Sequence, residues 1–132
     1  IEWQVQEFQS RTGIRTHLTA EPSEIELDRE HSTTAFRILQ EALTNVAGHA
    51  QAAAVSVNLT ADAKRLILKV IDNGKGITPQ ALADRRSFGL LGMRERALLM
   101  GGQVTISGRP DQGTTVTLVM PLKRPAITHP VG

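Results

Sequence analysis

Apolar residues recur at the 3.6-residue period of a helix in three segments, about 1–11, 28–50 and 90–100. Thr12-Gly13 and Gly101-Gly102 end the first and the last of these segments, because glycine readily adopts the conformation that closes a helix. The longest segment carries a continuous apolar stripe. We expect this stripe to consist of Phe36, Leu39, Leu43, Val46 and Ala50. The pattern therefore predicts three helices.

Other segments alternate apolar and polar residues, as half-buried strands do. They are residues 14–20, 54–60, 65–71, 103–107 and 115–121. The short link Ala61–Lys64 predicts an antiparallel hairpin, and Arg109–Gly113 contains the Pro, Asp and Gly of a turn. Together the elements predict an α+β fold: a two-layer sandwich in which helices cover one face of a mixed, mostly antiparallel sheet.

The composition narrows the classes of function. In a chain of 132 residues, 40% are apolar, which is enough for one domain with a core. Aromatic residues make up 3%, which argues against a stacking platform for single-stranded nucleic acid. There is no cysteine, so disulfides and thiolate metal sites are excluded. A net charge of +2 is too small to indicate a polyanionic partner, and no nucleic acid is expected.

Targeting signals are not apparent in the sequence. No apolar run approaches the length of a membrane span, and the chain begins with Ile1 without a recognisable signal peptide. We expect a cytoplasmic domain without membrane contact of its own. We also expect a fragment of a longer protein, which leaves open an inner-membrane anchor elsewhere in the parent.

One face of the long predicted helix carries residues suited to a metal and a phosphate. Arg37, Glu41, Asn45 and His49 follow at intervals of four residues and share this face. Asn45 offers a neutral oxygen to Mg²⁺, which usually keeps several waters and binds substrate phosphates. Glu41 is the candidate catalytic residue, because it can polarise a water or hydroxyl or hold a water on the metal. His49 can contact a phosphate. The alternative is a solvated face with an Arg37–Glu41 ion pair.

A glycine turn, Asp72-Asn73-Gly74-Lys75-Gly76, follows a predicted strand. An aspartate at the strand end can accept a hydrogen bond from an exocyclic amine, which would select adenine. Gly74 and Gly76 allow the backbone to approach the base closely. The alternative is an ordinary β-turn, whereas EF-hand and Walker loops lack residues that they require.

A second glycine-rich segment, Gly89-Leu90-Leu91-Gly92-Met93-Arg94-Glu95-Arg96, opens the last predicted helix. Free backbone N–H groups and the helix dipole favour phosphate at such a position. The preceding residues 77–88 are charged and lack an apolar stripe, so we expect a mobile lid there. A local basic patch suits a phosphate chain. It consists of Lys75, Arg85, Arg86, Arg94 and Arg96. The alternative is a capped helix with surface arginines.

The order of these motifs carries more information than any one of them. E-A-L-T-N at 41–45, D-N-G-K-G at 72–76, G-L-L-G-M-R-E-R at 89–96 and G-T-T-V-T-L-V-M-P at 113–121 resemble the N, G1 and G2 boxes and the final strand of the GHKL ATPase superfamily. Within it, the chain is similar to the catalytic ATP-binding domain of a bacterial two-component sensor histidine kinase, of the nitrate-sensor and desaturase-regulator branch. The resemblance covers about residues 14–122.

The resemblance implies the Bergerat α/β sandwich and binding of Mg²⁺-ATP. By resemblance, Asn45 would bind the Mg²⁺ ion, and Glu41 would be the acidic residue of the N box. Asp72 would bind the adenine amine, helped by Thr114 through water, and the glycines of its turn would shape the base pocket. The lid hinge and the phosphate-binding helix start would be formed by Gly89, Leu90, Leu91, Gly92 and Met93.

The implied activity is that of a protein-histidine kinase, a transferase of two-component signal transduction. It would donate the γ-phosphate to a histidine on a separate dimerisation domain, with a response regulator downstream. That acceptor histidine is not expected in this chain, because His17 is predicted in a strand, His31 at a helix start and His129 in the tail.

The same resemblance suggests how the chain is divided. Residues 1–13 would be the end of a helix that connects to the missing dimerisation domain, 14–122 the catalytic domain and 123–132 a flexible tail. Gly48 stands where the family often has a basic residue, which predicts one missing phosphate contact. Two alternatives stay open: a serine kinase of the anti-sigma-factor type, and a non-catalytic nucleotide-sensing module.

Overall fold

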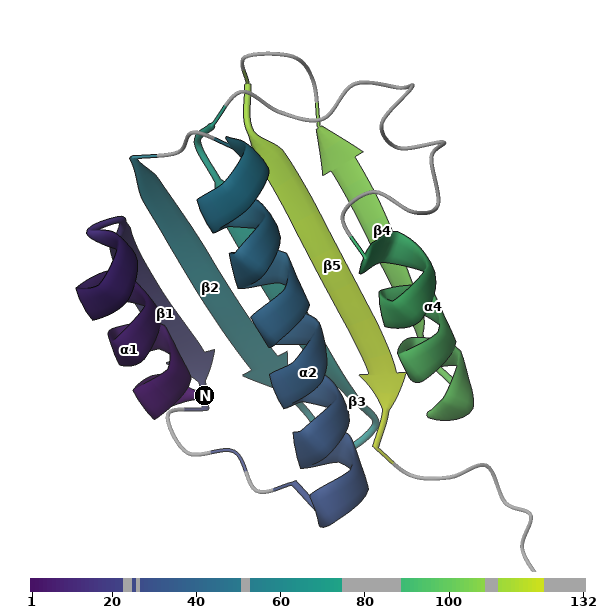
Figure 1. Ribbon diagram of the computed structural model, residues 1–132. Helices are drawn as coiled ribbons and strands as arrows, with labels where there is room; N and C mark the ends of the chain where they lie inside the picture. Colours follow the sequence, from purple (N-terminus) through teal and green to yellow (C-terminus); the bar gives the residue numbers. More distant parts are fainter. Residues whose placement is uncertain (23–24, 26, 51–52, 75–88, 109–111, 123–132) are drawn as a thin grey trace, which may run out of the picture.

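The computed structural model describes residues 1–22, 25, 27–50, 53–74, 89–108 and 112–122. One sheet is covered on one face by helices, as Figure 1 shows, which confirms the predicted two-layer α+β sandwich. The helices are α1 (Glu2–Thr12), α2 (Arg29–Asn45) and α4 (Leu90–Leu99). The strands are β1 (Arg15–Glu21), β2 (Ala54–Ala61), β3 (Arg65–Asp72), β4 (Gln103–Gly108) and β5 (Thr114–Pro121). All of them lie close to the segments that the sequence pattern predicts.

The sheet is mixed and mostly antiparallel, as predicted. Its strand order is β1-β2-β3-β5-β4. β1 runs parallel to β2, whereas β2 with β3, β3 with β5, and β4 with β5 pair antiparallel. Because β5 returns between β3 and β4, the end of β3 and the start of β5 are direct neighbours.

The core lies between the sheet and the helices. Leu66, Leu68 and Val70 alternate along β3 and are buried on the helix-covered face, as the alternation predicts. Phe8 of α1 and Met93 of α4 are buried in the same cluster. The apolar faces of α1 and α4 therefore pack into the same core as the central strands.

The predicted apolar stripe of α2 is wrong at Phe36, which is 40% exposed. The side chains that α2 buries belong to Ala35, Ile38, Leu39, Ala42 and Leu43, followed by Val46. The predicted and the observed buried positions both follow intervals of three and four residues. The prediction chose the large Phe36 in preference to the small alanines. Residue 36 lies on the flank of α2 that faces α1, where the side-chain amide of Gln4 donates to the Phe36 carbonyl oxygen at 2.9 Å.

The two ends of α2 differ. At its start, Asp28 is the N-cap residue, and its Oδ1 accepts the backbone N–H of His31 at 2.8 Å. The buried His31 ring also lies 2.8 Å from Pro121 O, which joins the start of α2 to the end of β5. At the other end the predicted helix continues beyond Asn45, but as a π-helical turn, Val46–Ala50. Such turns frequently mark functional sites.

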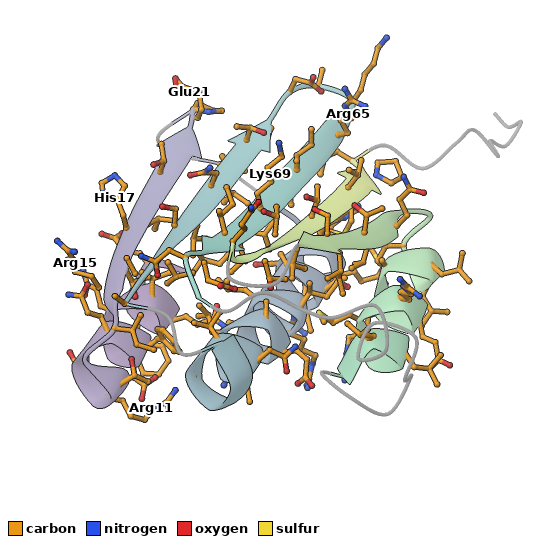
Figure 2. All side chains as sticks on the ribbon, turned by 90° about the horizontal axis from the view of Figure 1, so that it is seen from above. Arg11, Arg15, His17, Glu21, Arg65 and Lys69 are labelled. Atoms are coloured by element: carbon orange, nitrogen blue, oxygen red, sulfur yellow. The ribbon has the colours of Figure 1, made fainter. Side chains whose placement is uncertain are left out.

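The opposite face of the sheet carries polar and charged side chains. Figure 2 shows Arg15, His17 and Glu21 of β1 and Arg65 and Lys69 of β3 directed away from the helices. Half-buried Ile67, Ile71 and Val119 lie on the same face among these polar side chains, and no helix covers it within the described residues. None of the described helices combines the length and the apolar character that crossing a bilayer requires.

Candidate functional site

The motifs singled out in the sequence come together at one end of the sheet. Figure 1 shows the C-terminal end of α2, the end of β3, the start of β5 and the start of α4 at this same end. The register of β3 and β5 pairs Asp72 with Thr114. These residues are far apart in the chain, so the fold assembles the candidate site from separate segments.

Asp72 provides a buried carboxylate in this site. It is the last residue of β3 and continues the alternation of Leu66, Leu68 and Val70, so its side chain is on the helix-covered face. Its exposed fraction is 7%, and among the described residues it is the only buried carboxylate. Burial raises the pKa of Asp72, although hydrogen bonds from the backbone N–H groups of Gly74 and Thr114 oppose that shift.

The backbone around Asp72 is held closely. The Gly74 N–H donates to Asp72 Oδ1 at 2.8 Å, which holds the first three residues of the predicted turn together. Gly113 has φ +82°, and a Cβ atom at this position would overlap the Asp72 carbonyl oxygen. The glycine before β5 therefore lets that strand lie directly against the Asp72 backbone. Gly76 lies outside the described residues.

Sequence reasoning missed the role of Asn73. Its Oδ1 accepts the backbone N–H groups of Ala53 and Ala54, each at 3.0 Å. The side chain thereby joins the end of β3 to the start of β2. Short asparagine side chains after a strand often bond to backbone groups in this way, and this preference was the available signal.

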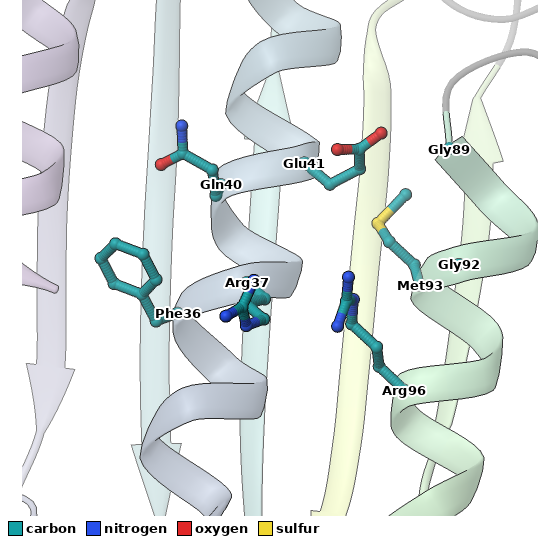
Figure 3. Close-up of a pocket in the computed structure, with 8 residues that line it drawn as sticks. All are labelled: Phe36, Arg37, Gln40, Glu41, Gly89, Gly92, Met93 and Arg96. Atoms are coloured by element: carbon teal, nitrogen blue, oxygen red, sulfur yellow. The ribbon is translucent and has the colours of Figure 1, made fainter.

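Glu41 extends from α2 toward the start of α4 (Figure 3). The contact with Gly89 is close: a Cβ atom built on Gly89 would lie 2.8 Å from Glu41 Cγ and would overlap the carboxylate. A negative charge near a helix N-terminus is stabilised by the helix dipole. The described ion pairs do not include Arg37–Glu41, so the structure does not contain the ion pair of the alternative interpretation, whereas a solvated helix face stays open.

The predicted phosphate-binding segment divides into buried and exposed side chains. Leu90 and Met93 are buried in the core, so their side chains fasten α4 to the sheet. Leu91, Gly92 and Arg94 are exposed. The buried Leu90 can therefore contribute only backbone groups to a ligand, whereas Arg94 can contribute its side chain.

The end of α2 contributes Asn45 and the residues after it. Asn45 is the last residue of α2 and is half-buried. Gly48 lies in the π-helical turn, and a Cβ atom there would meet nothing within 4 Å. Crowding around the Cβ position therefore does not require glycine at residue 48. The His49 side chain lies outside the part of the chain that the structure describes.

The described residues contain no group of three or more His, Asp or Glu side chains that could hold a metal ion. The predicted ligand Asn45 stands at the end of α2, where it offers one amide oxygen. The predicted lid, residues 77–88, and the basic residues Lys75, Arg85 and Arg86 lie outside the described residues.

A groove of about 270 Å³ extends from the exposed face of α2 to α4, beside Glu41. Figure 3 shows Glu41 and Arg96 in the gap between the two helices, and Phe36 and Gln40 on the other side of α2. Its walls are formed by Phe36, Arg37, Gln40, Glu41, Gly89, Gly92, Met93 and Arg96. Sequence reasoning did not identify this groove, because it depends on how α2 and α4 pack together. The residues that meet there, Glu41 and Gly89, are 48 positions apart in the chain.

Gly89→Ala is expected to lower the free energy of unfolding by at least about 1–2 kcal/mol, the cost of a left-handed conformation for a residue with a Cβ atom. Gly89 has φ +62°, and the new methyl group would displace the Glu41 carboxylate. Chemical denaturation of both proteins measures the change.

Gly92→Ala is the matched control, because a Cβ atom at residue 92 would meet nothing within 4 Å and the residue lies inside α4. We expect this variant to be as stable as the parent chain or more stable, by up to about 1 kcal/mol. Equal effects of the two substitutions would contradict the role assigned to Gly89.

Comparison with known proteins identifies related sequences. Residues 30–124 match a family described as "Histidine kinase-, DNA gyrase B-, and HSP90-like ATPase". The chain is also 39% identical over 115 residues to "Signal transduction histidine-protein kinase/phosphatase UhpB" of Salmonella typhimurium. This match covers 87% of the chain but only 22% of UhpB, so the chain corresponds to about a fifth of that relative's length.

Solved structures share the fold. The blue-light activated histidine kinase of Erythrobacter litoralis EL346 superposes with a TM-score of 0.75 at 20% identity, over 96% of this chain and 42% of that one. The mycobacterial sensor histidine kinase MprB superposes with a TM-score of 0.71 at 21% identity, over 91% of each chain. At such identities, the likeness establishes the architecture alone.

Proposed function

The chain belongs to the family of histidine kinase-, DNA gyrase B- and HSP90-like ATPases, and on this premise we propose that it is the ATP-binding catalytic module of a sensor histidine kinase. It would transfer the γ-phosphate of Mg²⁺-ATP to a histidine on a separate dimerisation domain. One observation carries the proposal: the buried Asp72 carboxylate and the Glu41–Gly89 contact lie at the same end of the sheet. Under this proposal, Asp72 would serve the base and the start of α4 beside Glu41 would serve the phosphates.

Asp72 would bind the adenine amine. A buried carboxylate that already accepts the Gly74 N–H is fixed in position and shielded from water. A hydrogen bond to a charged group under these conditions is stronger than one in solvent. Guanine has a carbonyl oxygen where adenine has this amine, so the same carboxylate would disfavour GTP. Thr114, the partner of Asp72 across the two strands, would assist through a water.

The start of α4 would bind the phosphates. Its free backbone N–H groups and the helix dipole favour negative charge there, and Arg94 is exposed beside them. Glu41 lies against this helix start and would receive or redirect the proton that leaves the attacking histidine. Phosphoryl transfer depends mostly on positioning and charge neutralisation, which a rigid helix start can supply.

Asn45 would be the protein ligand of Mg²⁺, which neutralises phosphate charge when it is bound. Asn45→Ala is therefore expected to weaken Mg²⁺-dependent ATP binding without changing the fold. Calorimetric titration with ATP, with and without Mg²⁺, measures the effect, and circular dichroism monitors folding.

The neighbouring Thr44 offers a matched control. Its hydroxyl is exposed and donates to the Gln40 carbonyl oxygen at 2.8 Å, one turn earlier on the same helix. In the Thr44→Ala variant, ATP binding should depend on Mg²⁺ as strongly as in the parent chain. If Asn45→Ala keeps it as well, the ligand role of Asn45 is wrong.

The proposal includes the partners of the module. Its substrate would be the dimerisation domain of the same protein, and a response regulator would act downstream. No contact of this module with nucleic acid or membrane is proposed.

Val5 and Phe8 of α1 are buried in the core, so this helix is firmly attached to the module. We propose that α1 connects the module to the dimerisation domain and that both act on the cytoplasmic side, where ATP is available.

Phosphotransfer to the dimerisation domain tests the function. The chain is mixed with Mg²⁺ and γ-labelled ATP and with the dimerisation domain of its parent protein. The expected product is a phosphohistidine, which is labile in acid and stable in base. An acid-stable product would indicate a serine kinase instead. ATP binding without any transfer would indicate a non-catalytic nucleotide-sensing module.

A further inference from the structure

Two arginines from different helices line the groove between α2 and α4. Arg37 belongs to α2 and Arg96 to α4, and Figure 3 shows Arg96 extending from α4 toward α2. Neither guanidinium group has a hydrogen bond or an ion pair within the described part of the chain. By comparison, Arg11 on α1 is paired with Glu7 at 3.0 Å. Among the described residues, the two cations of the groove therefore have no ion-pair partner, although the Glu41 carboxylate forms part of the same wall.

The groove also adjoins the phosphate end of the candidate site. Glu41 and Gly89 form part of its wall, and Gly92 lies one turn into α4. A group that occupied the groove would lie beside the place where the γ-phosphate is transferred. The two arginines could therefore contact a group that approaches the γ-phosphate.

The residues around the arginines indicate a protein surface rather than a free anion. Phe36 is 40% exposed and lines the groove together with the two arginines. A small anion bound to the arginines would leave this exposed phenyl ring in water. Arginine and aromatic residues are the types most enriched where proteins bind one another, and charged partners there are usually complementary.

We propose that this groove binds an acidic side chain of the phosphoacceptor domain, so that Arg37 and Arg96 position the acceptor histidine against the γ-phosphate. The occupant is a carboxylate on the surface of that domain, with apolar residues beside it that cover Phe36. This inference rests on the proposed kinase function and adds to it the residues that recognise the substrate. Arg37 and Arg96 are positioning residues, because they act through the bound acceptor domain.

The test is a kinetic comparison in which ATP is saturating and the concentration of the dimerisation domain is varied. Arg37→Gln and Arg96→Gln are each expected to raise the KM for that domain about threefold, and the double variant about tenfold, the range for exposed charge pairs. The kcat and the dissociation constant for ATP should stay nearly unchanged. Raising the salt concentration should diminish the difference between the parent chain and the double variant.

Two further variants serve as controls. Arg29→Gln removes an exposed arginine from the first turn of the same helix, away from the groove, and should leave KM unchanged. Arg37→Lys combined with Arg96→Lys keeps both charges and should restore most of the loss. An unchanged KM in the double glutamine variant would overturn the inference. Weakened ATP binding in that variant would also overturn it, because the arginines would then serve the nucleotide.

The result also separates this inference from the proposed function. If the parent chain phosphorylates the dimerisation domain and the double glutamine variant does so with the same KM, only the docking role fails. If the parent chain transfers no phosphate at all, the kinase function itself is wrong.

Discussion

Glu41→Gln is expected to lower the rate of phosphotransfer about 100- to 10,000-fold, the contribution typical of a positioned acid or base. Glutamine has nearly the same shape and can keep the contact with Gly89, so the helix start should remain intact. The substitution removes the negative charge of residue 41 and its ability to take up a proton. A single-turnover measurement with saturating ATP and dimerisation domain gives the rate of the chemical step.

Glu95→Gln is the control for this experiment, because Glu95 is an exposed carboxylate on α4. We expect it to transfer phosphate at the parent rate, and both variants to bind ATP as the parent does. If Glu41→Gln transfers phosphate normally, Glu41 is not the catalytic residue. If it loses ATP affinity instead of rate, its role is in nucleotide binding.

Asp72→Asn is expected to weaken ATP binding by about 1–3 kcal/mol, the range for a hydrogen bond to a charged group. Asparagine has the same size, and its carbonyl oxygen can still accept the Gly74 N–H. The fold should therefore persist while the charge that attracts the adenine amine is lost. Calorimetric titration with ATP and GTP measures both affinity and selectivity, and the variant should bind the two nucleotides more equally.

The same substitution should make the folded protein more stable at neutral pH. Burial raises the pKa of Asp72 above 3.8, its ordinary value, so the folded state holds the proton more tightly than the unfolded state. The contribution of protonated Asp72 to the free energy of unfolding is fully present below pH 3.8, and it is lost as the pH rises through the folded-state pKa. Asparagine does not ionise, so Asp72→Asn should gain stability over the parent as the pH rises, as thermal unfolding at several pH values can measure.

Asp62→Asn should change stability with the opposite sign. Hydrogen bonds from the backbone N–H groups of Lys64 and Arg65 lower the pKa of Asp62, which sits in the exposed hairpin. Its ionised form therefore favours folding, and the contribution is lost as the pH falls through the lowered folded-state pKa. A stability gain at neutral pH in both variants would contradict the burial argument for Asp72.

The strands were predictable because alternation follows directly from the geometry of a strand. The same alternation extends from Leu66 to Asp72, so the sequence already indicated that this carboxylate is on the covered face. The helical stripe of α2 was less well determined. A helix allows several sets of positions at intervals of three and four, and the small buried residues Ala35 and Ala42 gave a weaker signal than Phe36.

The parts of the site that depend on tertiary packing were not predictable. The contact of Glu41 with Gly89 joins two helices, and neither motif alone indicates that these two residues meet. The groove with Arg37 and Arg96 has the same origin. Asn73 was missed for another reason, because its bonds to Ala53 and Ala54 serve the sheet and not the ligand that the motif suggests.

The central claim is that one end of the sheet binds ATP, and titration of the ¹⁵N-labelled chain with a nonhydrolysable ATP analogue and Mg²⁺ tests it most directly. The account predicts that backbone amide signals change at Asn45, Asp72, Gly74 and Thr114 and at the start of α4. Signals of the open sheet face, such as those of His17 and Lys69 (Figure 2), should stay in place. No change on titration, or changes centred on that open face, would contradict the account.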